Sequence, residues 1–227
     1  MSQAPEPAAG DPLLRLKEHP EISLLIASAD RVAEGLGYTE HGFRHANLVG
    51  SIAFNVLDRL GHDEHTAGLA GASGYLHDVG NMATRHNHPQ TGAILVYTIL
   101  RDEMQPEDLA TIVGAVANHE EEDGARISPV SAAVILADKA DVHRSRVRAK
   151  PGADADIHEL VNYAAESSFL RVDSGAGTIT LELTIDTKIS QVMEYFEIFL
   201  QRMSMCRTAA RTLGCSFKLN INGSELL

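Results

Sequence analysis

Gly74-Tyr75-Leu76-His77-Asp78-Val79-Gly80 closes an apolar, helix-like run with a histidine and an aspartate side by side, just before a glycine interrupts the pattern. Adjacent side chains on a helix point about 100° apart, so this pair does not form one helix face. The two side chains can instead converge on an ion held just beyond the helix terminus. An adjacent His-Asp pair is common, so its weight depends on partners elsewhere in the chain, which are His45, His88, His119 and Asp138.

Length, charge and cysteine content exclude several classes of protein. The 227 residues can bury one good core with a small appendage. A net charge of −12 argues against a general binder of nucleic acid or anionic membranes. The two cysteines have no CxxC spacing, and the apolar runs are far shorter than the about 20 residues of a membrane-spanning helix. We expect a cytoplasmic protein without a membrane partner.

Apolar residues at helical spacing predict a helical bundle over residues 21–150, after a disordered leader over 1–20. Asp63 is the expected N-cap of a helix over 64–77, whose many small residues suggest close approach by its neighbours. His41 and His45 are four residues apart and would share one helix face. The expected helices are 21–35, 39 or 40 to 60, 64–77, 89–101, 106–119 and 129 to beyond 143.

The pattern changes after Pro151-Gly152, the best candidate linker, and residues 151–227 form an expected α+β extension. A short helix is expected over 156–165. Strict alternation predicts strands over 178–185 and 217–221, separated by a long helix that Asp186 or Thr187 caps. Because two strands alone are marginal in water, the extension should pack on the helical part or pair with a second subunit. A homodimer is therefore expected.

The histidines and aspartates predict a metal centre. Of the 11 histidines, eight lie between His41 and His119. Imidazole with carboxylate suits Mn or Fe first, with Co, Ni, Zn or Mg as further candidates. One ion would be held by His45, His77, Asp78 and Asp138. His88 and His119 would either hold a second ion, with Asp78 bridging, or contact the substrate.

The order His45, His77-Asp78, Asp138 resembles the HD superfamily of metal-dependent phosphohydrolases, over about residues 40–148. The motifs His88-Pro89, His119-Glu120 and Leu136-Ala137-Asp138 also resemble the HD-GYP branch, which hydrolyses cyclic dinucleotides. Four features depart from the pattern. Asn81 stands where a lysine often follows the His-Asp motif, and Asn118 stands in place of the first of the branch's paired histidines. No Gly-Tyr-Pro follows Asp123-Gly124, and the step from His77 to His88 is shorter than in that branch. The resemblance therefore implies the helical fold and the phosphohydrolase class, but not the cyclic-dinucleotide substrate.

A basic run begins one residue after Asp138 and consists of Lys139, Arg144, Arg146, Arg148 and Lys150. Arginine can bind phosphate through two parallel hydrogen bonds, so the run is a candidate phosphate-binding patch. The alternatives are a solvated helix face or a patch that contacts an acidic interface. The candidate substrate-binding residues are Lys139, Arg144, Arg146 and His41. His41 is equally a candidate metal ligand. His41 or His119 is the candidate proton donor.

The resulting expectation is a hydrolase of a small phosphoester or nucleotide, in which a metal-bound hydroxide attacks phosphorus and His77, Asp78 and Lys139 are catalytic. Two alternatives stay open. A di-iron oxygenase can use the same ligand types, and a non-catalytic nucleotide sensor is favoured by Asn81 and Asn118. The acidic chain should repel long nucleic acids.

Overall fold

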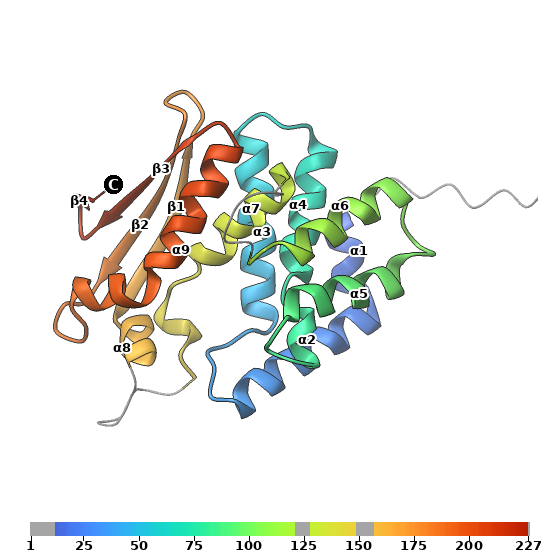
Figure 1. Cartoon of the computed structure of the whole chain (residues 1–227), viewed down its shortest axis with the longest axis horizontal. Coiled ribbons are helices and arrows are strands. Elements are labelled where there is room, and N and C mark those ends of the chain that lie inside the picture. The colour runs from blue at the N-terminus through green and yellow to red at the C-terminus, as the bar shows by residue number, and fades with distance from the viewer. Residues whose placement is uncertain (1–11, 121–127, 149–156, 227) are drawn as a thin grey trace, which may run out of the picture.

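The computed structural model describes residues 12–120, 128–148 and 157–226 (Figure 1). Over these residues the chain is mainly helical with a small C-terminal four-stranded sheet, which confirms the predicted fold class. None of the described helices is both long and apolar enough to cross a membrane. Lys150 and the expected linker at Pro151-Gly152 lie outside the described residues.

In chain order the helices are α1 (Pro12–Glu18), α2 (Pro20–Gly35), α3 (Phe43–Arg59), α4 (Glu64–Leu76), the 3-10 helix η1 (Val79–Met82), α5 (His88–Leu100), α6 (Pro106–Ala117), α7 (Pro129–Ala140), the 3-10 helix η2 (Arg144–Arg146), α8 (Ile157–Ala164) and α9 (Val192–Thr212).

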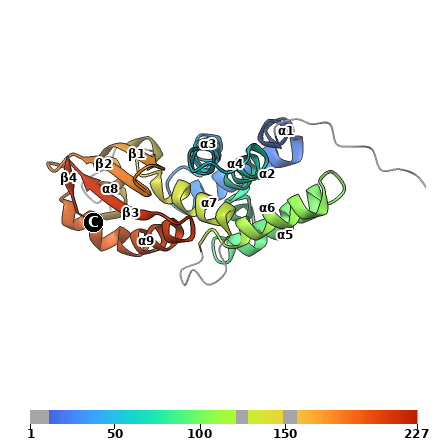
Figure 2. The ribbon, with the colours of Figure 1, turned by 90° about the horizontal axis from the view of Figure 1, so that it is seen from above.

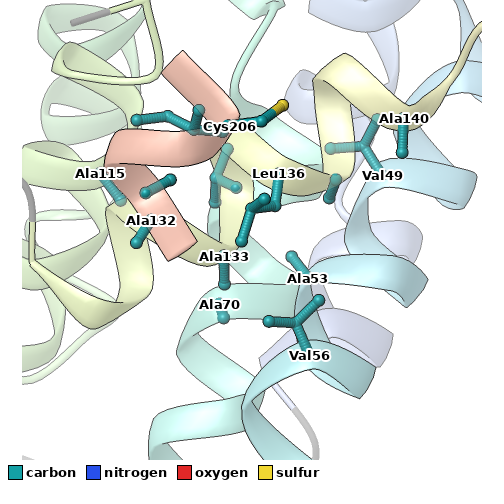
Figure 3. Packing of buried hydrophobic residues seen from close by; sticks show 14 of the residues in the cluster. Val49, Ala53, Val56, Ala70, Ala115, Ala132, Ala133, Leu136, Ala140 and Cys206 are labelled. Carbon is teal, nitrogen blue, oxygen red and sulfur yellow. The ribbon is translucent and has the colours of Figure 1, made fainter. Parts of the chain in front are cut away.

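Helix α7 is the centre of the core. Figure 2 shows it between the sheet with α9 at one end of the molecule and the helices α1, α2, α5 and α6 at the other. Its side chains from Val130 to Ala137 are buried. In Figure 3, Val49 and Ala53 of α3 lie on one side of Leu136, and Cys206 of α9 lies on the other. The helices before residue 148 and the C-terminal extension therefore share one core.

Helices α3 and α4 pack closely at glycines, as the small residues of the 64–77 helix predicted. A Cβ atom added to Gly74 would lie 2.9 Å from the carbonyl oxygen of Val49 and 3.0 Å from the Cα of Gly50. Asp63 caps α4, because its Oδ1 accepts a hydrogen bond of 2.9 Å from the backbone N–H of Thr66. The close crossing fixes the end of α4, where His77 and Asp78 follow.

Replacing Gly74 with alanine should destabilise the fold by about 1–3 kcal/mol, because the added methyl group meets backbone that cannot yield. The measurement is the free energy of unfolding in urea. Gly114 is the matched control in α6, since a Cβ there meets nothing within 4 Å. Gly114→Ala should stabilise by about 0.5–1 kcal/mol through helix propensity. Equal effects of the two changes would contradict the close packing.

Two helix boundaries differ from the expected ones and matter for the site. Helix α3 begins at Phe43 with Gly42 as its N-cap, so His41 precedes the helix and does not share its face with His45. Helix α7 ends at Ala140 rather than beyond His143. Asp141 leaves helical geometry there, with ψ of 71°, because its carboxylate is held by His45 and Arg44.

The expected disordered leader over 1–20 is wrong from Pro12 onward. Residues 12–18 form α1, and Leu13 and Leu16 are buried because α1 packs against α4. Their spacing of three places both leucines on one helix face, a short apolar stripe among the prolines and charges. Residues 1–11 lie outside the described residues.

The extension has more strands than the alternation predicted. In sheet order the strands are β1 (Ala165–Asp173), β2 (Thr178–Ile185), β3 (Ser216–Ile221) and β4 (Ser224–Glu225), with β1–β2 and β3–β4 antiparallel and β2–β3 parallel. β1 was missed because its outer face carries an exposed Phe169 that blurs the alternation.

The long helix of the extension begins later than expected and packs on the helical domain. α9 starts at Val192, because Gln191 and Glu194 form a capping box, and Asp186 instead caps a turn by accepting from the Lys188 N–H. α9 packs against α7, and β1 packs against α3 and α7. This confirms that the extension covers the helical part, whereas the homodimer stays a prediction.

Candidate metal centre

Four buried histidines point their Nε2 atoms at one another, because each Nδ1 is anchored by a protein acceptor. The Nδ1 atoms donate to the Asp141 carboxylate (2.7 Å) and to the carbonyls of Gly74 (2.8 Å), Arg85 (3.0 Å) and Val116 (2.7 Å), from His45, His77, His88 and His119 respectively. A carbonyl or carboxylate can only accept, so Nδ1 carries a hydrogen and Nε2 is the ring atom that is left to bind an ion. All four rings are thus arranged as metal ligands are.

Helix ends bring these rings together. His77 is the C-cap of α4 and Asp78 turns out of the helix directly after it. His88 is the first residue of α5, and His119 follows the end of α6. Gly80 packs against the first turn of α5, where a Cβ would overlap the carbonyl oxygen of His88. This close approach places Asp78 beside His88.

The Nε2 atoms form two pairs that need a cation between them. His45 and His77 have their Nε2 atoms 3.2 Å apart, and those of His88 and His119 are 3.1 Å apart. Two lone pairs at this distance repel each other unless a proton or an ion lies between them. Two nitrogens bound at about 2.1 Å to one ion, at right angles, would be about 3.0 Å apart. The observed spacing therefore fits ligands of a shared ion.

Asp78 faces both pairs, one with each carboxylate oxygen. Its Oδ2 lies 3.5 Å from His45 Nε2 and 3.3 Å from His77 Nε2. Its Oδ1 lies 3.2 Å from His88 Nε2 and 3.9 Å from His119 Nε2. Two groups able to hold a metal ion result, His45-His77-Asp78 and Asp78-His88-His119, and Asp78 is common to both.

Asp138 of α7 completes the first group. Its Oδ1 lies 3.4 Å from His45 Nε2 and 3.6 Å from His77 Nε2. The first group thus has four protein donors and the second has three, and the fewer donors of the second leave room for a substrate or water. The structure brings together all six residues that the sequence proposed as ligands: His45, His77, Asp78, His88, His119 and Asp138.

The electrostatics of the cluster also favour a bound cation. Burial raises the pKa of the Asp78 and Asp138 carboxyls, but His77 and Lys139 outweigh it and hold both values well below the usual range. Burial lowers the pKa of His77, yet the neighbouring carboxylates raise it to about 10. Without a metal, a protonated His77 neutralises these carboxylates. A divalent ion would supply that charge instead.

Sequence reasoning missed the residues that orient the ligands. Asp141 accepts from His45 Nδ1 and forms a two-pronged ion pair with Arg44, through distances of 2.7 and 3.3 Å. Asn81 donates to Asp78 Oδ1 at 2.7 Å, so its side chain orients a proposed ligand. Both lie three residues after a proposed ligand, Asp138 or Asp78, and that spacing was the available signal.

Replacing Asp141 with asparagine should weaken metal binding about 10- to 100-fold, because the charged partner that orients His45 is lost. Titration of the metal-free chain with Mn²⁺ measures this. Asp58→Asn is the matched control, since Asp58 is exposed on α3. Unchanged affinity in the Asp141 variant would mean that His45 does not bind the ion.

His41 lies beside the cluster rather than in either group. Its ring centroid is 5.6 Å from that of His45, and its Nδ1 donates to the Thr39 carbonyl at 2.6 Å. Burial is the main influence on its pKa and lowers it to about 3, so the ring is neutral. Burial and the nearby His77 likewise hold the pKa of His119 well below its usual value. A neutral ring whose Nδ1 proton is already donated to a carbonyl is a poor proton donor, which weakens the assignment of that role to His41 or His119.

The described part of the basic run is not a single phosphate patch. Lys139 is buried at the cluster, with its Nζ 2.5 Å from Asp138 Oδ2 and 3.9 Å from Glu120 Oε1. The arginines bind protein acceptors instead: Arg144 with Glu166, Arg146 with the carbonyls of Glu40 and Asp141, and Arg148 with Asp30. Phosphate binding by Arg144 and Arg146 stays a prediction that would require these contacts to be exchanged.

A polar cavity of about 180 Å³ opens beside the second group. Residues from the start of α5 and the end of α6 line it: Asn87, Pro89, Gln90, Ala117 and Glu120. Glu120 lies 4.0 Å from His88 and 3.9 Å from Lys139. The cavity therefore provides space for a small ligand next to His88.

Comparison with known proteins agrees with this geometry. Residues 42–143 match the HD domain family, and this range contains His45, His77, Asp78, His88, His119 and Asp138. No curated protein matches the chain. The C-terminal extension lies outside the matched range. Residues 42–143 are thus an HD domain with a buried His/Asp metal-binding cluster.

Proposed function

We propose that this chain is a metal-dependent hydrolase of a small phosphoester or nucleotide. The observation that carries the proposal is the pair of buried ligand groups that share Asp78. Two ions held by these residues would supply Lewis acidity and would lower the pKa of coordinated water, as hydrolytic two-metal sites require. Mn and Fe suit the mixed imidazole and carboxylate donors best, with Co, Ni, Zn or Mg as further candidates.

The residues of the cluster have different roles in the proposed reaction. His45, His77, Asp78 and Asp138 give the first group four donors, whereas the second has three and lies nearest the cavity that Glu120 lines. Lys139 supplies positive charge at the edge of the cluster, where it would orient a phosphoryl group. Asp78 faces His77 with Oδ2 and His88 with Oδ1, so it would contribute one oxygen to each group.

A small substrate fits the size of the cavity and the charge of the chain. The 180 Å³ beside the second group would accommodate only part of a nucleotide, and a net charge of −12 disfavours long polyanions. We include a cytoplasmic location and a homodimer in the proposal. The location rests on two cysteines that remain free, Cys206 and Cys215, and the dimer on the apolar character of the extension.

The test is hydrolysis by the full chain, loaded with Mn²⁺, of an aryl phosphate monoester, an aryl phosphate diester and a panel of nucleotides. We expect turnover that a chelator abolishes and added Mn²⁺ restores. Removal of oxygen should leave the rate unchanged, which separates a hydrolase from an oxygenase. A folded, metal-loaded chain that hydrolyses none of these substrates would refute the proposal.

A further inference from the structure

Asn81 carries a buried amide whose two ends contact different partners. The residue is 3% exposed and lies in η1, which packs against α2 and α5. Its Nδ2 donates to Asp78 Oδ1 at 2.7 Å and to the Asp78 carbonyl at 3.1 Å. Its Oδ1 accepts a hydrogen bond of 3.0 Å from Arg85 Nη1. Both ends of the amide are therefore satisfied inside the protein.

Arg85 holds this amide in the orientation that serves Asp78. A guanidinium has only donors and a carboxylate has only acceptors, so the amide oxygen must face Arg85 and the amide N–H groups must face Asp78. Turning the amide over would create two repulsive contacts. Without Arg85, the buried Oδ1 of Asn81 would lose its donor, and a rotation of the side chain away from Asp78 would relieve that cost.

Tyr38 and His88 in turn fix the position of Arg85. The central carbon of the guanidinium lies 5.3 Å from the ring centroid of Tyr38, a cation–π contact. The backbone carbonyl of Arg85 accepts from His88 Nδ1 at 3.0 Å. Arg85 thus reaches Asp78 through its side chain and His88 through its backbone, and both are ligands of the second group.

We propose that Arg85 is a positioning residue for the second ion: by holding the Asn81 amide, it directs Asp78 Oδ1 toward His88. A carboxylate oxygen can accept from two directions, and Asn81 takes one of them. The other is left for an ion on the side of His88, whose Nε2 lies 3.2 Å away. The first group should depend less on this orientation, because it has three further donors: His45, His77 and Asp138.

Titration of the metal-free chain with Mn²⁺, read by electron paramagnetic resonance, gives the affinity of each ion and tests the inference. Arg85→Met removes every donor and keeps an unbranched stem beside Tyr38. It should weaken the second ion about 10- to 100-fold, the range for losing a group that orients a ligand. The first ion should change less than about 3-fold.

Two further variants separate charge and donors from general disturbance. Arg85→Lys should restore part of the second-ion affinity, because an ammonium group also only donates. Arg101→Gln is the matched control, since Arg101 is exposed at the far end of α5 from His88. It should match the wild type for both ions.

A double-variant cycle shows whether Arg85 acts through Asn81. Asn81→Ala alone should weaken the second ion by a similar factor, and adding Arg85→Met should cost less than about 3-fold more, because the amide is already gone. A variant that merely disturbed the loop would displace His88 instead, and its effect would add in full. All variants should show the circular dichroism of the wild type.

Equal second-ion affinity in Arg85→Met and the wild type would overturn the inference, as would an equal loss at both ions or full additivity with Asn81→Ala. A wild-type chain that takes up a single ion would also overturn it. None of these readouts uses hydrolysis. A chain that binds two ions but hydrolyses no phosphoester would therefore refute the proposed function and leave the role of Arg85 intact.

Discussion

Replacing Asp78 with alanine should remove both metal ions and reduce turnover by at least about 10³-fold, more than the loss of a single transition-state donor causes. The reason is that one carboxylate serves both groups, with Oδ2 facing His45 and His77 and Oδ1 facing His88. Its loss removes the only carboxylate that the second group has among the described residues and one of the two in the first group, where Asp138 remains. Metal analysis of the purified variant and the rate of phosphoester hydrolysis measure the two effects.

Asp58→Ala is the matched control for this change. Asp58 is exposed on α3 and far along the helix from His45, so its removal should alter neither metal content nor turnover. Both variants should show the circular dichroism of the wild type, which excludes unfolding as the cause. An Asp78 variant that keeps the metal content and the rate of the wild type would show that the bridging carboxylate is not a ligand.

Replacing His88 with alanine should halve the metal content, from two ions per chain to one. Only the second group loses a donor, because His45, His77, Asp78 and Asp138 remain. We expect turnover to fall about 10²- to 10³-fold, since the three-donor group nearest the cavity is the one disrupted. Metal analysis alongside the kinetics distinguishes this from a general collapse of the site.

The control is His86→Ala, two residues earlier on an exposed part of the loop before α5. It should behave as the wild type in both measurements. A His88 variant that retains two ions would assign His88 to the substrate instead of the metal. A His88 variant that binds no ion would mean that the two groups cannot fill independently.

The ligands could be predicted from the sequence because they lie at helix ends. His77-Asp78, His88-Pro89 and His119-Glu120 each interrupt or open an apolar run, and helix ends meet in an antiparallel bundle. Small residues in the 64–77 segment likewise predicted the close crossing that Gly74 makes with α3. In both cases a local pattern is sufficient, since the neighbours of these positions follow from helix order.

Residues that act through long-range contacts could not be predicted in this way. Asp141 reaches across 96 positions to His45, and the sequence marks it only as a charge within a basic run. The same run was expected to bind phosphate. Arg146 instead donates to the backbone carbonyl of Glu40, and Arg148 donates to the carboxylate of Asp30. Such roles follow from tertiary packing, which has no local signal.

The most direct test of the paired site is electron paramagnetic resonance of the chain during titration with Mn²⁺. Ligand groups that share the Asp78 carboxylate should take up two ions per chain and give an exchange-coupled multiline spectrum as the second ion binds. Saturation at one ion per chain, or two ions that keep the six-line signal of isolated Mn²⁺, would contradict the bridged pair on which the proposed function depends.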